Sequence, residues 1–257
     1  MKKLRKVVLL LLTLCLAIPV HTVNVQAATV EKTSITSAKQ VGKKSVEIVW
    51  DEIDGVNGYE VAYRVKGGKW TTKSTNRNCV TLSKLKVSKT YQFKVRAYKK
   101  TKKSVQYGKY SVPKKVKVNK YVYLGNLYEP YNSSESYEPY INGNFIMMGG
   151  KKRLNGFTLG FDCSYTEKKA DFNIEGKYSK VTFKVGKVDG ANNSPSDGDF
   201  DVNVYADGVL VDTIVVQVDD LPQSVSVNLD YTERLTFEVE ERAYTVVGFS
   251  DIKLYFR

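Results

Sequence analysis

Between residues 29 and 118 the chain consists of short runs in which apolar and polar residues alternate, and no run has the period of a helix. Alternation places successive side chains on opposite faces of a strand, so each run predicts a strand with one buried face. Turn-forming pairs separate the runs, as at Asp54-Gly55 and Gly67-Gly68. The predicted strands are Val46–Trp50, Tyr59–Val65, Trp70–Ser74, Cys79–Leu82 and Tyr91–Tyr98. Short strands at these intervals predict an immunoglobulin-like sandwich.

The same alternation returns between residues 121 and 257. Val181, Phe183 and Val185 share one face of a run, and Asp207-Gly208 joins two further runs as a hairpin signal. The predicted strands are Asn144–Met148, Phe157–Leu159, Asp171–Ile174, Val181–Val185, Phe200–Tyr205, Val209–Val216, Ser224–Leu229, Leu235–Val239 and Ile252–Phe256. An all-β segment with many short strands predicts a second sandwich or a jelly roll.

Residues 1–27 have the pattern of a secretory signal peptide. A basic start precedes the apolar segments Val7–Leu12 and Leu14–Ile18, and Val25-Gln26-Ala27 supplies the small residues before cleavage. The apolar stretch is shorter than the ~20 residues that a membrane-spanning helix needs. We therefore expect cleavage after Ala27 and a secreted, extracellular protein without a membrane span, either free or held at the cell envelope by binding.

Few residues remain for chemistry after this cleavage. The single histidine, His21, lies within the predicted signal peptide, so histidine-dependent hydrolysis and histidine zinc sites are excluded from the exported chain. Cys79 and Cys163 fall in different predicted domains, and we expect two unpaired thiols, although an oxidising environment would permit a bridge. No pair of carboxylates stands out as catalytic, so the sequence predicts a protein that is not an enzyme.

Charge divides the chain into two parts. Residues 29–118 carry 22 Lys and Arg against 6 Asp and Glu, whereas residues 119–257 carry 14 against 21. Such an asymmetry favours two domains, which we place at residues 29–118 and 121–257. The basic domain could attract an anionic cell-wall polymer, or its lysines could simply be solvated strand faces. No nucleic-acid-binding motif accompanies the charge, so nucleic acid is not an expected partner.

One stretch of the basic domain matches a known family. Leu85, Tyr91, Phe93, Val95 and Ala97 occur in the pattern LKVSKTYQFKVRAY, which resembles fibronectin type III domains. The resemblance implies that Tyr91 forms a corner with backbone upstream of its strand. It also implies that the tryptophan of Val46–Trp50 is buried in the core. For Trp70, which stands beside Lys69, packing and ligand contact both remain open.

The second domain also resembles a known family. The residues that carry the resemblance are Tyr123–Leu127, Asn155-Gly156, Glu175–Tyr178, Val185-Gly186, Asp189-Gly190, Tyr205 with Asp207-Gly208, and Asp251–Leu254. They are similar to the NPCBM/NEW2 modules, which are carbohydrate-binding β-sandwiches attached to secreted glycoside hydrolases, including family 98. The resemblance implies a jelly-roll or galactose-binding-like sandwich that binds galactose-containing glycans. The chain departs from the family at Gly160, where a histidine is common, and at Phe249, where a tryptophan is common.

A sugar site needs an aromatic face and a few fixed hydrogen-bonding groups. The candidate carbohydrate-binding residues are Asp162, Tyr165, Tyr244, Phe249 and Asp251. Each could equally be a packing residue or part of a solvated loop.

Four aspartates crowd one segment, DGANNSPSDGDFD, at positions Asp189, Asp197, Asp199 and Asp201. Clustered carboxylates suit calcium, but their spacing does not fit an EF-hand. An ordinary acidic turn and an irregular calcium site are therefore the two alternatives, and no other cofactor is expected.

These patterns together predict a secreted, non-catalytic carbohydrate-binding protein. Its fold class is all-β, with a fibronectin type III sandwich followed by a galactose-binding-like sandwich. The alternative function is a surface or matrix interaction protein that binds cell-wall polymer or another protein. A glycosidase is disfavoured because two small sandwiches occupy the whole exported chain, leaving no domain to place two carboxylates around a scissile bond.

Overall fold

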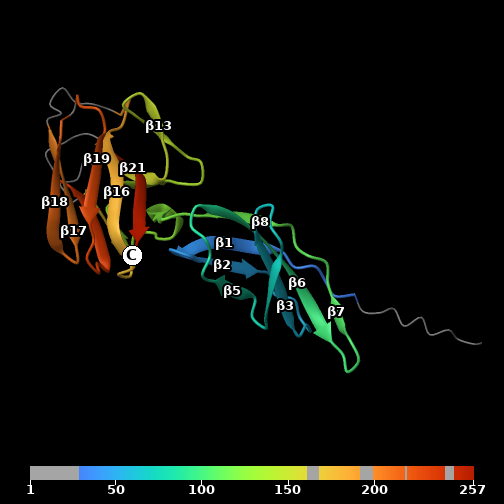
Figure 1. Ribbon diagram of the computed structural model, residues 1–257. Coiled ribbons are helices and arrows are strands. Elements are labelled where there is room, and N and C mark those ends of the chain that lie inside the picture. The colour runs from blue at the N-terminus through green and yellow to red at the C-terminus, as the bar shows by residue number, and fades with distance from the viewer. Residues whose placement is uncertain (1–28, 161–167, 192–198, 218, 241–245) are drawn as a thin grey trace, which may run out of the picture.

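The computed structural model describes residues 29–160, 168–191, 199–217, 219–240 and 246–257. Within them the chain folds into two successive β-sandwiches, shown in Figure 1 with the first in blue to green and the second in green to red. Apart from the 3-10 turn η1 (Leu124–Asn126), these residues form strands and loops. None of the described helices is long and apolar enough to span a membrane. The predicted all-β fold class is confirmed.

The first sandwich consists of a three-stranded and a five-stranded sheet. The three-stranded sheet contains β1 (Ile35–Gly42), β2 (Ser45–Trp50) and β5 (Cys79–Leu82) in that order. The five-stranded sheet contains β4 (Thr71–Thr75), β3 (Gly58–Val65), β6 (Lys89–Lys100), β7 (Val105–Tyr107) and β8 (Lys114–Val118). Both β7 and β8 pair with the long strand β6, which is therefore the centre of this sheet.

The residues of the fibronectin type III pattern form the core of this sandwich. Trp50 is only 1% exposed and meets the Tyr59 ring edge-on at 5.4 Å between centroids. Tyr91 is also buried, and its hydroxyl oxygen accepts a hydrogen bond from the Lys86 backbone N–H at 2.9 Å. The core positions of Trp50 and Tyr91 and the tyrosine corner are thus confirmed. Cys79 carries a free thiol, and Cys163 lies outside the described residues.

The second sandwich packs a five-stranded sheet against a six-stranded sheet. The five-stranded sheet contains β10 (Asn132–Ser133), β15 (Lys168–Asn173), β20 (Arg234–Val239), β17 (Phe200–Ala206) and β18 (Val209–Val216). The six-stranded sheet contains β11 (Tyr137–Tyr140), β14 (Gly156–Leu159), β21 (Val247–Phe256), β16 (Tyr178–Lys187), β19 (Gln223–Asn228) and β9 (Tyr121–Tyr123), which pairs with β21. A separate hairpin joins β12 (Ile146–Met148) and β13 (Lys151–Arg153).

Aromatic rings from both sheets fill the space between them. The Phe157 ring stacks on Phe249 at 4.8 Å between centroids and meets Phe237 edge-on at 5.6 Å. Phe183 and Phe172 extend the cluster, and each of these five rings is at most 2% exposed. Offset and edge-on pairs of this kind add to the stabilisation from apolar burial. The cluster fixes the spacing of the two sheets and hence the positions of the loops at each end.

Only Asn119 and Lys120 connect β8 of the first sandwich to β9 of the second. The Gln40 side chain exchanges two hydrogen bonds with the Asn119 backbone, one in each direction and each 2.8 Å long. The Lys120 carbonyl accepts a hydrogen bond from the backbone N–H of Phe256, in the last strand of the second sandwich. Each connecting residue is therefore bonded to a different sandwich.

Candidate functional site

Five strands of the second sandwich, β14, β15, β17, β20 and β21, begin or end at the same edge of the two sheets. Leu159 at the end of β14 lies opposite Val247 at the start of β21. Lys168 at the start of β15 lies opposite Val239 at the end of β20, and Val239 also faces Val202 of β17. The chain segments 161–167, 192–198 and 241–245 connect strands at this end. We refer to this part of the second sandwich as the loop end.

Three of the five predicted sugar-binding residues belong to these connections. Asp162 and Tyr165 follow β14, and Tyr244 precedes β21. All three lie outside the described residues, so their role stays a prediction. The described strand ends that flank them, Leu159 with Val247 and Lys168 with Val239, are paired at this end of the sandwich.

Phe249 requires a correction, because its ring belongs to the aromatic core. The side chain is fully buried, and its ring contacts those of Phe157, Phe183 and Phe237 at centroid distances of 4.8, 6.0 and 5.4 Å. A buried ring has no face to offer a sugar. Phe249 therefore serves as a packing residue between the two sheets.

Asp251 lies away from the loop end. It sits four residues beyond Val247 on β21, which corresponds to about 13 Å along a strand. Its backbone adopts a φ of 53° where the pairing of β16 with β21 shifts register, and its carboxylate lies 4.0 Å from the Lys253 ammonium. Asp251 thus belongs to a bulge between β16 and β21 and lies away from the strand ends that define the loop end.

A polar group that sequence inspection missed borders the loop end. The Asn203 amide nitrogen donates to a Glu240 carboxylate oxygen at 3.2 Å, and the Thr213 hydroxyl donates to the Asn203 amide oxygen at 2.7 Å. The Glu240 backbone N–H donates to the Asp201 carbonyl oxygen, which ties this group to the start of β17. Tyr205 stands further along the same face, and burial, followed by its hydrogen bond to Glu238, raises its pKa. We call Asn203, Tyr205, Thr213 and Glu240 the polar row.

Gly160, where the family commonly has histidine, leaves space for a side chain. A Cβ atom added there would meet nothing closer than a Val246 methyl group at 3.6 Å, an ordinary contact. The backbone N–H of Gly160 bonds to the Ser136 carbonyl oxygen. The described residues therefore leave room for a Cβ atom at this position.

The acidic residues proposed for calcium have separate roles where they are described. The Asp189 carboxylate accepts hydrogen bonds from the backbone N–H groups of Gly149 and Gly150 at 2.9 and 2.8 Å, and so holds the turn between β12 and β13. Asp199 is exposed, and Asp201 is partly buried in β17. Asp197 lies outside the described residues, within which no three acidic, histidine or cysteine side chains are grouped to hold a metal. Calcium binding stays a prediction.

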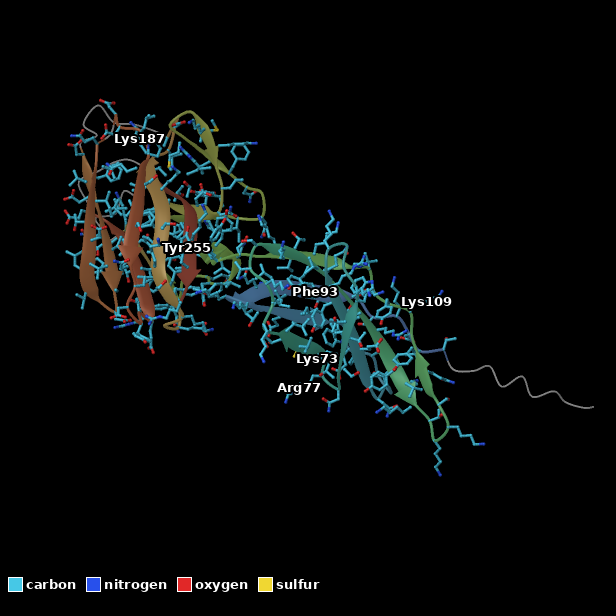
Figure 2. All side chains as sticks on the ribbon, viewed as in Figure 1. Lys73, Arg77, Phe93, Lys109, Lys187 and Tyr255 are labelled. Carbon is cyan, nitrogen blue, oxygen red and sulfur yellow. The ribbon has the colours of Figure 1, made fainter. Side chains whose placement is uncertain are left out.

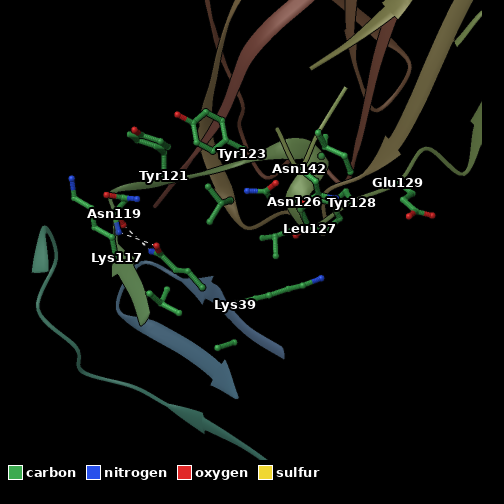
Figure 3. A pocket seen from close by; sticks show the side chains of 16 residues that line it. Lys39, Lys117, Asn119, Tyr121, Tyr123, Asn126, Leu127, Tyr128, Glu129 and Asn142 are labelled. Atoms are coloured by element: carbon green, nitrogen blue, oxygen red, sulfur yellow. Dashed lines mark hydrogen bonds between the residues drawn. The ribbon is translucent and has the colours of Figure 1, made fainter. Parts of the chain in front are cut away.

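A second candidate location is a cleft of about 730 Å³ between the two sandwiches (Figure 3). Tyr121 and Tyr123 contribute rings to it, with 5.6 Å between their centroids. Burial and a hydrogen bond with Tyr121 raise the pKa of Tyr123 to about 12. Lining side chains with hydrogen-bonding groups are Lys39, Gln40, Lys117, Asn119, Asn126, Tyr128, Glu129 and Asn142. Phenol rings and amides of this kind can also bind a polar ligand.

The comparisons with known proteins address the two sandwiches separately. Residues 22–112 match the fibronectin type III domain family, as the sequence predicted for the first sandwich. No curated protein matches the chain significantly. The NPCBM/NEW2 resemblance of the second sandwich stays a prediction.

The solved structures to which the chain is similar include structures with CBM51 domains and the FN5 domain of Drosophila Lar. The M60 catalytic domain with the CBM51-1 and CBM51-2 domains of Clostridium perfringens ZmpB is 15% identical, with a TM-score of 0.44. The match covers 87% of this chain, which spans 31% of that one. CBM51 from Clostridium perfringens GH95 in complex with methyl-galactose is 20% identical over 52% of this chain and 99% of its own, with a TM-score of 0.41. The FN5 domain of Drosophila Lar is 15% identical over 35% of this chain and 98% of its own, with a TM-score of 0.30.

Proposed function

We propose that this chain is a secreted, non-catalytic carbohydrate-binding protein. In this proposal the second sandwich binds a galactose-containing glycan at its loop end. The first sandwich positions it at a fixed distance from whatever surface holds the protein. The galactose preference rests on the resemblance of residues 121–257 to the NPCBM/NEW2 modules.

The observation that supports this proposal is that the strand ends flanking residues 161–167 and 241–245 lie beside one another and beside the polar row. Aromatic rings bind the C–H face of a pyranose, and fixed hydrogen-bonding groups select its hydroxyls. Tyr165 and Tyr244 belong to segments that connect strands at the loop end. Glu240 provides a partly exposed carboxylate, and the buried Asn203 amide, itself held by Thr213, fixes the orientation of that carboxylate.

A shallow site of this composition binds weakly. One stacking ring and a few hydrogen bonds that replace bonds to water provide only ~4–8 kcal/mol, which corresponds to dissociation constants between millimolar and micromolar. Useful avidity would then require several sites on one surface. The measurement must therefore detect weak binding.

The test uses the full exported chain on a glycan array, followed by calorimetric titration with the strongest ligand. We expect signal on galactose-containing glycans, and we expect Tyr165→Ala or Tyr244→Ala to weaken it at least tenfold. Asn203→Ala should weaken it by a smaller factor. Tyr231→Ala is the matched control, because Tyr231 is 71% exposed and lies near the other end of the sandwich, beside Gly176.

Two results would overturn the proposal. One is an array without signal for any glycan. The other is glycan binding that survives all three loop-end substitutions and is lost on Tyr123→Ala, which would move the site to the cleft between the sandwiches. Release of sugar from any bound glycan would contradict the non-catalytic assignment.

A further inference from the structure

The glycan proposal leaves the strong positive charge of the first sandwich without a role. Exposed basic side chains such as Lys73, Arg77 and Lys109 extend from this sandwich (Figure 2). On the outer face of its five-stranded sheet, several of these basic side chains are held by contacts with aromatic rings. On β6 the buried side chains occupy the odd-numbered positions from Tyr91 to Ala97, so Lys94 and Arg96 point outward.

Rings and cations alternate across this face. The Lys94 ammonium lies 4.3 Å from the centroid of the Trp70 ring and 4.0 Å from that of Tyr110. The Arg96 guanidinium carbon lies 4.4 Å from the Tyr110 centroid and 3.9 Å from that of Tyr107. Stacking of a cation on a ring is favourable and restricts the side chain to one orientation. We call this arrangement the cation ladder.

The arginines of this face already have partners within the protein. Arg96 donates from Nε and Nη2 to one carboxylate oxygen of Glu60, at 2.8 and 2.7 Å. The Tyr110 hydroxyl donates to that same oxygen at 2.5 Å. Arg64 donates from Nε to the Gln92 amide oxygen at 3.0 Å, and its guanidinium carbon lies 4.3 Å from the Trp70 centroid. The guanidinium groups of Arg64 and Arg96 are thus held in place by hydrogen bonds within the face.

The lysines of the face remain available. Lys115 pairs with Gln92 across β8 and β6, and Lys117 pairs with Thr90, so both project on the same side as Lys94. Among the described residues, none of these three lysines takes part in an ion pair. On the outer face of β3 the acidic side chain is that of Glu60, and its charge is neutralised by Arg96. The face therefore presents ammonium groups without acidic partners among the described residues, and that of Lys94 is held between two rings.

We propose that this face binds a linear polymer that carries phosphodiester groups. The bidentate hydrogen bonds of an arginine suit carboxylates and phosphates alike, and both arginines of this face are bonded within the protein. Lysine ammonium groups act as point charges and suit phosphates, whose oxygens accept from many directions. Neutralising a polyanion also releases its counterions, so several moderate contacts along one chain add up to useful affinity. This activity involves a different sandwich from the glycan site and is independent of it.

The test measures binding of the full exported chain to poly(glycerol phosphate), with polygalacturonate as a carboxylate polymer of similar charge density. We expect tighter binding to the phosphate polymer, weakening steeply with added salt. Replacing Lys94, Lys115 and Lys117 together by glutamine should weaken binding about tenfold or more. It should also reduce the slope of log affinity against log salt by roughly 2, since each lost contact with a flexible polyanion contributes about 0.7.

The matched control replaces Lys43, Lys44 and Lys84 by glutamine, which removes the same charge from exposed positions outside this face. An equal loss in both triple variants would overturn the proposal, because net charge alone would explain the binding. Equal affinity for polygalacturonate would overturn the assignment to phosphate. A third variant, Trp70→Ala, keeps every charge but removes the ring that restrains Lys94, and we expect a loss of about threefold. Unchanged binding in that variant would overturn the role of the cation ladder.

Discussion

Tyr91 shows how one hydroxyl group supports the first sandwich. Its Oη accepts a hydrogen bond from the Lys86 backbone N–H at 2.9 Å, and its ring is only 6% exposed. Tyr91→Phe keeps the ring but leaves this N–H without its partner. An unpaired, partly buried donor costs about 1–3 kcal/mol. Calorimetry should therefore show a lower melting temperature for the first sandwich and an unchanged transition for the second.

Tyr63→Phe is the control, because it removes a hydroxyl from the same sheet at a site with no hydrogen bond in the described part of the chain. We expect that change to have little effect. Equal destabilisation of both transitions by Tyr91→Phe would instead mean that the boundary near Val118–Tyr121 does not separate two folding units.

Single residues were predictable from sequence where one face of a strand is buried and the other is not. Trp50 and Tyr91 occupy the apolar positions of such strands, and both are core residues. Phe249 was not predictable in this way, because residues 247–250 are all buried and alternation carries no information there. The polar row was missed for a different reason. It joins Asn203 of β17, Thr213 of β18 and Glu240, the residue after β20, and their contact depends on a strand register that the sequence does not display.

At the scale of elements, two nearby glycines differ in how closely a neighbouring strand approaches them. The backbone of β21 lies against Gly156, whereas Gly160 has more space around it. A Cβ atom on Gly156 would lie 1.8 Å from the Phe249 carbonyl oxygen, which belongs to the neighbouring strand. Backbone cannot move aside as a flexible side chain can, so β14 and β21 would have to separate. We expect Gly156→Ala to lower the free energy of unfolding of the second sandwich by about 3 kcal/mol or more.

The Gly160→Ala variant is the control for Gly156→Ala, because both glycines lie in the same stretch of chain. Its nearest neighbour would be 3.6 Å from an added Cβ, so Gly160→Ala should change the free energy of unfolding by less than about 0.5 kcal/mol. Urea titration of both variants decides the matter. Similar losses in the two variants would show that the approach of β14 to β21 is not the cause.

Elements were predictable from sequence where alternation is strong. The predicted strand Cys79–Leu82 coincides with β5, and the strand predicted to end at Trp50 coincides with β2 within one residue. Three strands of the first sandwich had no such signal. All three residues of β7 are exposed, β8 consists mainly of lysines, and β1 buries only two of its eight residues. These strands form because a neighbouring strand provides hydrogen bonds for them, which is a tertiary effect.

At the scale of the whole molecule, alkaline pH should act through buried tyrosines. Burial and the negative charge of Glu129 raise the pKa of Tyr137 from 10.0 to about 12. Burial also raises the pKa of Tyr128 and of Tyr140. The folded state holds these protons more tightly than the unfolded state does. Their contribution to stability is therefore complete below pH 10.0 and is lost as the pH rises through about 12.

Circular dichroism and tyrosinate absorbance, recorded together from neutral to alkaline pH, test this expectation. We expect the second sandwich to unfold in that interval, with ionisation and unfolding occurring together. Tyr137→Phe should move the transition to higher pH. Tyr131→Phe, at an exposed ring, should leave it in place. Ionisation of all tyrosines well before any unfolding would contradict the assignment.

The connection between the sandwiches determines whether the face that carries the cation ladder and the loop end keep a fixed geometry. Gln40 is 7% exposed, and its two hydrogen bonds to the Asn119 backbone appear as dashed lines in Figure 3. Gln40→Ala removes both, so Asn119 should detach from the first sandwich. We expect NMR relaxation to show the two sandwiches tumbling together in the parent protein and more independently in the variant. Gln106→Ala, at an exposed position of β7, is the control. Independent tumbling already present in the parent would show that these bonds do not fix the joint.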